Sequence, residues 1–194
     1  TMESGLQRAI ERDELWLAYQ PQVDVATGAV VGAEALLRWH HPEMGTVSPG
    51  QFIPIAEETG LILPIGEWVL DRVCAQVNEW AADGLPFRIS LNLSAHQIRQ
   101  PDFCERIKGV IESRGTDPSR LVFELTESTL MEDSERTVGL LQRIKSLGIA
   151  VAADDFGTGY SSLRYLKRFP LSSLKVDQGF VRELTDNEED AVIV

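Results

Sequence analysis

The sequence predicts an α/β fold whose parallel sheet closes into a barrel. From residue 61 onward, segments with apolar residues at helical spacing alternate with short runs of β-forming residues, as in a series of strand–helix–strand crossover units. Several of these runs end in a carboxylate or an amide, which is typical of barrels that carry their chemistry at the carboxyl ends of the strands. The 194 residues are 43% apolar, and no low-complexity linker divides them. We therefore expect one domain over residues 1–194.

The first half of the chain predicts a hairpin between helical segments. Thr27-Gly28 supplies turn chemistry between two β-runs, and Pro49 suits the first position of a helix because its missing N–H would have no helical partner there. The expected elements are a short polar helix over residues 3–13, strands over Leu15–Val25 and Val30–Trp39, a helix beginning at Ser48-Pro49, and a long helix over Leu61–Ala82.

The second half predicts regular alternation. Four runs of β-forming residues are separated by segments of helical period, and Gly148 closes one of the helices. The expected strands are Arg88–Leu93, Leu121–Leu125, Ile149–Ala153 and Ser173–Val176, and the expected helices are Asp102–Arg114, Ser134–Leu147 and Ser161–Phe169. Six strand candidates fall short of eight, and residues 186–194 resemble the start of another helix. The C-terminal part of the barrel is therefore expected to be missing or incomplete.

Charge, cysteine spacing and hydropathy argue against several classes of function. A formal net charge of -12, with no basic stripe on any expected helix, argues against polymeric DNA or RNA as a partner. Cys74 and Cys104 lack a metal or redox spacing and are expected to be buried thiols. No signal-peptide pattern and no apolar run of about 20 residues is recognised in residues 1–194. We expect a cytoplasmic domain, with any membrane anchor in a longer parent chain.

Polar side chains at the strand ends predict one ion site. An ionised carboxylate on an apolar strand loses water, which is tolerable when a cation compensates the charge. Oxygen ligands without a His or Cys set favour a hard cation such as Mg²⁺ or Mn²⁺. The candidate ligands are Glu34, which lies within its strand, and Asn92, Glu124, Asp154, Asp155 and Asp177 at strand ends.

Each motif also has a structural interpretation. Two pairs could be plain ion pairs, Glu34 with Arg38 and Lys175 with Asp177. Three motifs could serve the backbone: Asn92 and Ser94 by satisfying its polar groups, Glu124 and Glu127 by flanking a helix start, and Asp154-Asp155 by forming a turn. Gln20 and Arg38 could be surface polar groups. Together these interpretations weaken, because they would leave several desolvated acids converging at one rim and repelling one another.

Over Leu15–Val194 the motifs resemble the EAL-domain family of cyclic di-GMP phosphodiesterases. The motifs in the family's order are Tyr19-Gln20-Pro21, Glu34-Ala35-Leu36-Leu37-Arg38-Trp39, His41-Pro42, Asn92-Leu93-Ser94, Glu124-Leu125-Thr126-Glu127, Asp154-Asp155-Phe156-Gly157-Thr158-Gly159 and Lys175-Val176-Asp177. The resemblance implies a modified TIM barrel with an antiparallel first strand, and hydrolysis of cyclic di-GMP to linear pGpG with the help of two metal ions.

The resemblance also implies roles for single residues. The first metal would be held by four residues, Glu34, Asn92, Glu124 and Asp154. The second metal would be held by Asp155 and Asp177. Lys175 would contact the attacking water or the phosphate, and Gln20 and Arg38 would bind the ligand. Glu127 and the loop of residues 155–161, with Phe156, Gly157 and Gly159, would couple a homodimer to the site. A sensor or GGDEF-type diguanylate cyclase domain would precede this one.

Two other functions fit part of the pattern. One is a receptor that binds cyclic di-GMP without cleaving it, and the other is a metal-dependent barrel enzyme acting on another phosphate ester or an enolisable acid. The family's Glu-Gly-Val-Glu and Gln-Gly-Tyr motifs do not occur up to Val194. A protein that ended there is expected to hydrolyse weakly and to close its barrel poorly.

Overall fold

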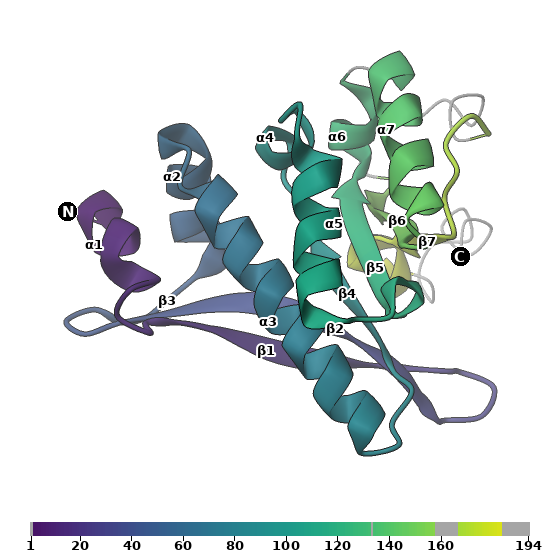
Figure 1. Ribbon diagram of the computed structural model, residues 1–194, viewed down its shortest axis with the longest axis horizontal. Coiled ribbons are helices and arrows are strands. Elements are labelled where there is room, and N and C mark those ends of the chain that lie inside the picture. Colours follow the sequence, from purple (N-terminus) through teal and green to yellow (C-terminus); the bar gives the residue numbers. More distant parts are fainter. Residues whose placement is uncertain (1, 133, 158–166, 184–194) are drawn as a thin grey trace. The chain divides into compact units, whose positions relative to one another are not determined.

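The computed structural model describes residues 2–132, 134–157 and 167–183 (Figure 1). Two compact units make up the chain, Thr1–Val122 and Phe123–Val194, and each is described by itself. The boundary falls inside strand β5 (Leu121–Thr126), so this strand begins in the first unit and continues into the second. The single domain expected from the sequence stays a prediction.

The first unit begins with a helix and an antiparallel hairpin. Helix α1 (Met2–Ala9) precedes β1 (Leu15–Val23), and β1 pairs antiparallel with β2 (Val30–His41). At the hairpin turn, the Thr27 backbone N–H and hydroxyl donate to the Asp24 carboxylate over 2.8 and 2.7 Å, which lowers the pKa of that carboxyl. The short strand β3 (Gly45–Val47) pairs with the end of β2.

Strand β4 (Arg88–Asn92) lies parallel to β2, so the sheet is mixed and its first strand is antiparallel. Gly32 of β2 stands opposite Arg88, and a Cβ at Gly32 would lie 2.7 Å from the Arg88 carbonyl oxygen. In the space above this glycine, Gln22 Nε2 of β1 reaches across β2 and donates to Ser90 Oγ of β4 over 3.2 Å. This contact ties the three strands together on one face.

Helices in the first unit pack against one another and on the strands. They are α2 (Pro49–Thr59), α3 (Ile62–Ala82), α4 (Ala95–Ile98), α5 (Phe103–Arg114) and the 3₁₀ turn η1 (Pro118–Arg120). Figure 1 shows α5 alongside α3, and ion pairs join them. Arg114 contacts both carboxylate oxygens of Asp71, while Arg106 bridges Glu67 and Asp102. Because these pairs are half-exposed, the apolar contacts beneath them contribute most of the packing energy.

The second unit contains two parallel strands with helices before and after them. After β5 come α6 (Glu127–Met131), α7 (Ser134–Ser146), β6 (Ala150–Phe156), β7 (Ser173–Val176) and α9 (Gln178–Glu183). Strands β6 and β7 pair in parallel, with Ala153 opposite Leu174. Buried residues on β6 and α7, among them Val151, Leu141 and Ile144, form the apolar interior of this unit.

The predicted α/β class and antiparallel first strand are confirmed. Long helices and strands begin and end within a few residues of the predicted positions, whereas the short elements β3, α4, α6 and α9 were missed. Most of the expected helix over Ser161–Phe169, and the expected helix start at residues 186–190, lie outside the described residues. Within the described part of the chain, no helix combines the length and the apolar character needed to cross a membrane.

Candidate metal site

Glu34 and Asn92 form a polar pair in the first unit. Strand pairing places Glu34 of β2 beside Ser90 of β4, and Asn92 lies two residues further on the same face of β4. Asn92 Nδ2 donates to Glu34 Oε1 over 2.9 Å. Because the amide nitrogen is used in this way, the Asn92 amide oxygen is the atom of this side chain that could ligate a cation.

Gln20 and Arg38 lie on the same face as Glu34. Gln20 of β1 is the antiparallel partner of Glu34, and Arg38 follows Glu34 by four residues along β2. Arg38 Nη1 donates to the Leu37 carbonyl over 2.9 Å, and Glu34 accepts from Asn92. The ion pair between Glu34 and Arg38 considered from the sequence stays a prediction.

A lysine and two carboxylates form the core of the site in the second unit. Lys175 Nζ of β7 lies 2.6 Å from Glu124 Oε2 of β5 and 3.2 Å from Asp154 Oδ1 of β6. The side chain of Glu124 is 1% exposed, that of Asp154 18% and that of Lys175 30%. Burial makes an isolated carboxylate costly, and the ammonium group compensates it. The structure thus pairs Lys175 with acids on the two preceding strands, while the pair with Asp177 considered from the sequence stays a prediction.

An irregularity in β6 accounts for the adjacent aspartates. Ala153 pairs with Leu174 and Phe156 pairs with Val176, so Asp154 and Asp155 together stand opposite the single residue Lys175. Asp155 has φ 54°, the left-handed region that aspartate tolerates better than most residues. Such a bulge changes the direction of side chains at a strand end. Regular alternation would send the two acids to opposite faces of the strand, and the bulge removes that constraint.

Asp177 closes the end of β7. Its backbone N–H donates to the Phe156 carbonyl over 3.3 Å, and its Oδ1 accepts the Gly179 N–H over 2.7 Å at the start of α9. The side chain therefore has an ordered position and retains its second carboxylate oxygen, Oδ2, for a ligand.

Glu127 is buried at the start of α6 and contacts the loop that follows β6. Its Oε2 accepts the Gly157 N–H over 2.9 Å, and its side chain is excluded from water at 6% exposure. Gly157 has φ 101°, and a Cβ there would lie 2.5 Å from Phe180 Cε2, so both conformation and space require glycine. Phe156 ends β6, whereas Gly159 lies outside the described residues.

Sequence reasoning missed two buried polar residues next to the predicted ligands. Ser90, 2% exposed, stands beside Glu34, and Gln97, 8% exposed, follows the Asn92-Leu93-Ser94 motif. The period of two along β4 could have shown that Ser90 and Asn92 share a face, and the Ser-x-x-Gln spacing from Ser94 is that of a capping box.

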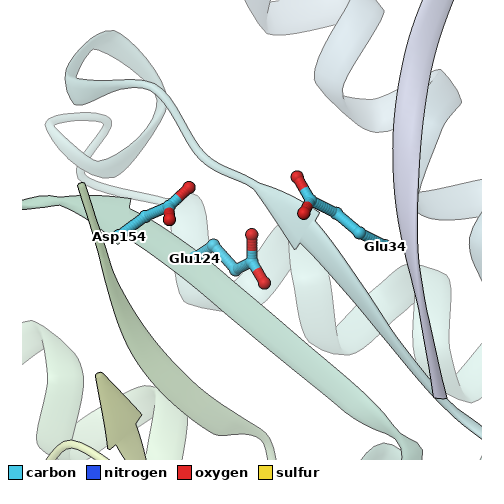
Figure 2. A group of neighbouring side chains, drawn as sticks. All are labelled: Glu34, Glu124 and Asp154. Atoms are coloured by element: carbon cyan, nitrogen blue, oxygen red, sulfur yellow. The ribbon is translucent and has the colours of Figure 1, made fainter. Parts of the chain in front are cut away.

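Figure 2 shows three carboxylate side chains among the predicted ligands. Glu34 lies on β2 in the first unit, and Glu124 and Asp154 lie on β5 and β6 in the second. Carboxylate oxygens are ligands that a hard divalent cation prefers. The charge of Glu124 and Asp154 also explains why Lys175 lies beside them in the second unit.

Comparison with known proteins identifies the family. The chain matches the EAL domain over residues 3–194. It belongs to the EAL domain family. The bifunctional diguanylate cyclase/cyclic di-GMP phosphodiesterase MucR of Pseudomonas aeruginosa is 46% identical over 190 residues, which make up 97% of this chain and 28% of MucR. The cyclic di-GMP phosphodiesterase PA2567 of the same organism is 42% identical over 185 residues, or 95% of this chain and 32% of PA2567.

Solved structures agree with this assignment. The MucR phosphodiesterase in its c-di-GMP complex matches with a TM-score of 0.94 and 45% identity, over 99% of this chain and 78% of that one. The EAL enzyme Bd1971, in a form with cAMP and cyclic di-GMP bound, matches with a TM-score of 0.90 and 31% identity, over 99% of this chain and 53% of that one. The EAL-domain chain thus spans under a third of the curated relatives named above.

Proposed function

We propose that this EAL domain is a metal-dependent phosphodiesterase that hydrolyses cyclic di-GMP to linear pGpG. The observation that carries the proposal is the family match over residues 3–194, in a chain that carries an acid or an amide at each ligand position that the resemblance implies up to Val194: Glu34, Asn92, Glu124, Asp154, Asp155 and Asp177. MucR and PA2567, both named as cyclic di-GMP phosphodiesterases, support the substrate.

Two divalent cations, Mg²⁺ or Mn²⁺, are the proposed cofactors. Glu34 and Asn92 of the first unit, together with Glu124 and Asp154 of the second, would hold one, and Asp155 and Asp177 would hold the other. The donor chemistry supports this assignment, since every proposed ligand offers oxygen and five of the six, all but Asn92, are carboxylates. When bound, the cations would supply the positive charge that stabilises an in-line displacement at phosphorus.

The remaining polar residues would orient the substrate. Arg38 offers a planar guanidinium that suits a phosphate, and Gln20 offers an amide beside Glu34. Lys175 would hold the attacking water or a phosphate oxygen with its ammonium group, which the 3.2 Å contact with Asp154 places beside a proposed ligand.

The test is nucleotide chromatography of cyclic di-GMP incubated with the protein as the cell makes it. We expect pGpG to accumulate with Mg²⁺ or Mn²⁺ and to be absent when EDTA is present in excess. Binding of cyclic di-GMP without any pGpG, under conditions in which the PA2567 relative turns over, would show a receptor and contradict the proposal. Cleavage of other phosphate esters in preference to cyclic di-GMP would contradict the substrate.

Regulation through the loop after β6 is part of the proposal. A second copy of the domain would act on this loop through α6, and an upstream sensor or GGDEF-type domain would supply the input. Two observations support it: the hydrogen bond from Gly157 to the buried Glu127, and a chain that covers 28% of the bifunctional relative MucR.

Replacing Glu127 by Gln is expected to lower kcat about tenfold. The substitution keeps the shape of the side chain but weakens a charge-assisted hydrogen bond by about 1 to 2 kcal/mol, so the Gly157 amide should also exchange faster with deuterium. Glu58→Gln, an exposed change of the same charge on α2, is the control and should leave both measurements unchanged. Wild-type turnover and wild-type protection of the Gly157 amide in Glu127→Gln would contradict the coupling role.

A further inference from the structure

We propose that Gln97 is a positioning residue for Asn92, acting through Ser94, and that Gly66 of helix α3 provides the space in which Gln97 does so. The inference rests on the proposed function, because Asn92 is a metal ligand only under that proposal. All four residues belong to the first unit.

A reciprocal capping box fixes the chain directly after β4. Gln97 N–H donates to Ser94 Oγ over 3.3 Å, and Ser94 N–H donates to Gln97 Oε1 over 3.0 Å. Asn92 lies two residues before Ser94, and Leu93 between them is buried at 8% exposure. Because both ends of this short segment are held, by strand pairing on one side and by the capping box on the other, the backbone of Asn92 has little freedom to move.

Gln97 is itself held against a long helix. A Cβ built on Gly66 would overlap Gln97 Nε2 and lie 2.7 Å from Gln97 Cδ, so the amide packs directly on the backbone of α3. Helix α3 has 21 residues and buries Ile65, Val69 and Val73, which makes it a rigid support. The physical path therefore runs from α3 through the Gln97 amide to the Ser94 N–H and on to Asn92.

The alternative interpretation is that the capping box stabilises α4 alone. That helix has four residues, and such a short helix adds little to the stability of a domain. A cap needed for α4 alone could also lie in solvent, whereas Gln97 is 8% exposed and occupies a place where α3 has no side chain. Gly66 and the buried Gln97 amide are both explained if they fix the position of Ser94 and, through it, the position of Asn92.

The test compares two helical glycines. Gly66→Ala should lower the affinity for Mn²⁺, measured without substrate by electron paramagnetic resonance, about tenfold or more, as expected for loss of a group that orients a metal ligand. Gly109→Ala on α5 meets nothing within 4 Å and should gain the helix propensity of alanine without changing Mn²⁺ affinity or turnover. Hydrogen exchange should show lost protection of the Ser94 amide in Gly66→Ala and normal protection in Gly109→Ala.

A double substitution distinguishes a clash between residue 66 and Gln97 from a general destabilisation of helix α3. Gln97→Ala removes the amide, so the space beside residue 66 opens and Gly66→Ala should add no further loss of Mn²⁺ affinity to that of Gln97→Ala. Additive losses, or a lost Ser94 protection with wild-type Mn²⁺ affinity, would overturn the inference. Failure of the proposed function would look different, because cyclic di-GMP would then stay uncleaved in the wild type while the variants still differed in Mn²⁺ affinity.

Discussion

Replacing Asp154 by Asn is expected to reduce hydrolysis of cyclic di-GMP at least about a thousandfold while the protein remains folded. The substitution preserves the volume of the side chain and removes one negative charge from the two carboxylates, Glu124 and Asp154, that contact Lys175. An amide is a weaker ligand for a hard cation than a carboxylate, and the proposed reaction depends on that cation. The measurement is pGpG formation at saturating Mg²⁺, with near-ultraviolet circular dichroism as the test of folding.

The control for Asp154→Asn is Asp83→Asn, an exposed aspartate at the end of α3. It makes the same chemical change away from the proposed site and should keep wild-type turnover. Folding should survive in both variants, since the Asp154 side chain is 18% exposed and a neutral amide can remain near Lys175. Turnover within a few-fold of wild type in Asp154→Asn would remove this residue from the metal site and weaken the proposed mechanism.

The sequence predicts which residues belong to the candidate site better than it predicts which of their side chains contact one another. Glu34 within a strand, and Asn92 and Glu124 near strand ends, follow from periodicity and motif order. The contact of Asn92 with Glu34 depends on the parallel register of β4 on β2, which brings together residues 58 apart in sequence. No local pattern contains that register, because it is decided by the crossover through α2 and α3.

The bulge at Asp154-Asp155 is a second property that the sequence alone does not contain. Whether two residues of β6 face one residue of β7 is determined by how Ala153 and Phe156 pair across the strands. The missed helices α4 and α6 have four and five residues, too short to show an apolar period. Their N-caps, Ser94 and Thr126, were the available signal, since each accepts a backbone N–H three residues on.

Replacing Lys175 by Met is expected to impair both stability and turnover, and the two effects should respond differently to Mg²⁺. Without a divalent cation, loss of the ammonium group 2.6 Å from the buried Glu124 should lower the free energy of unfolding by about 3 kcal/mol. Lys145→Met, an exposed lysine on α7, should change little by comparison. Urea unfolding with EDTA present measures the difference.

Saturating Mg²⁺ should restore most of the stability of Lys175→Met, because a cation held by Glu124 and Asp154 compensates the same carboxylates that Lys175 compensates in the structure. Turnover should stay at least about a hundredfold below wild type, since the cation does not replace the ammonium group that would hold the attacking water or the phosphate. Equal destabilisation with and without Mg²⁺ would mean that the cation does not bind beside Glu124. Recovery of turnover together with stability would mean that Lys175 supports the fold and takes no part in the reaction.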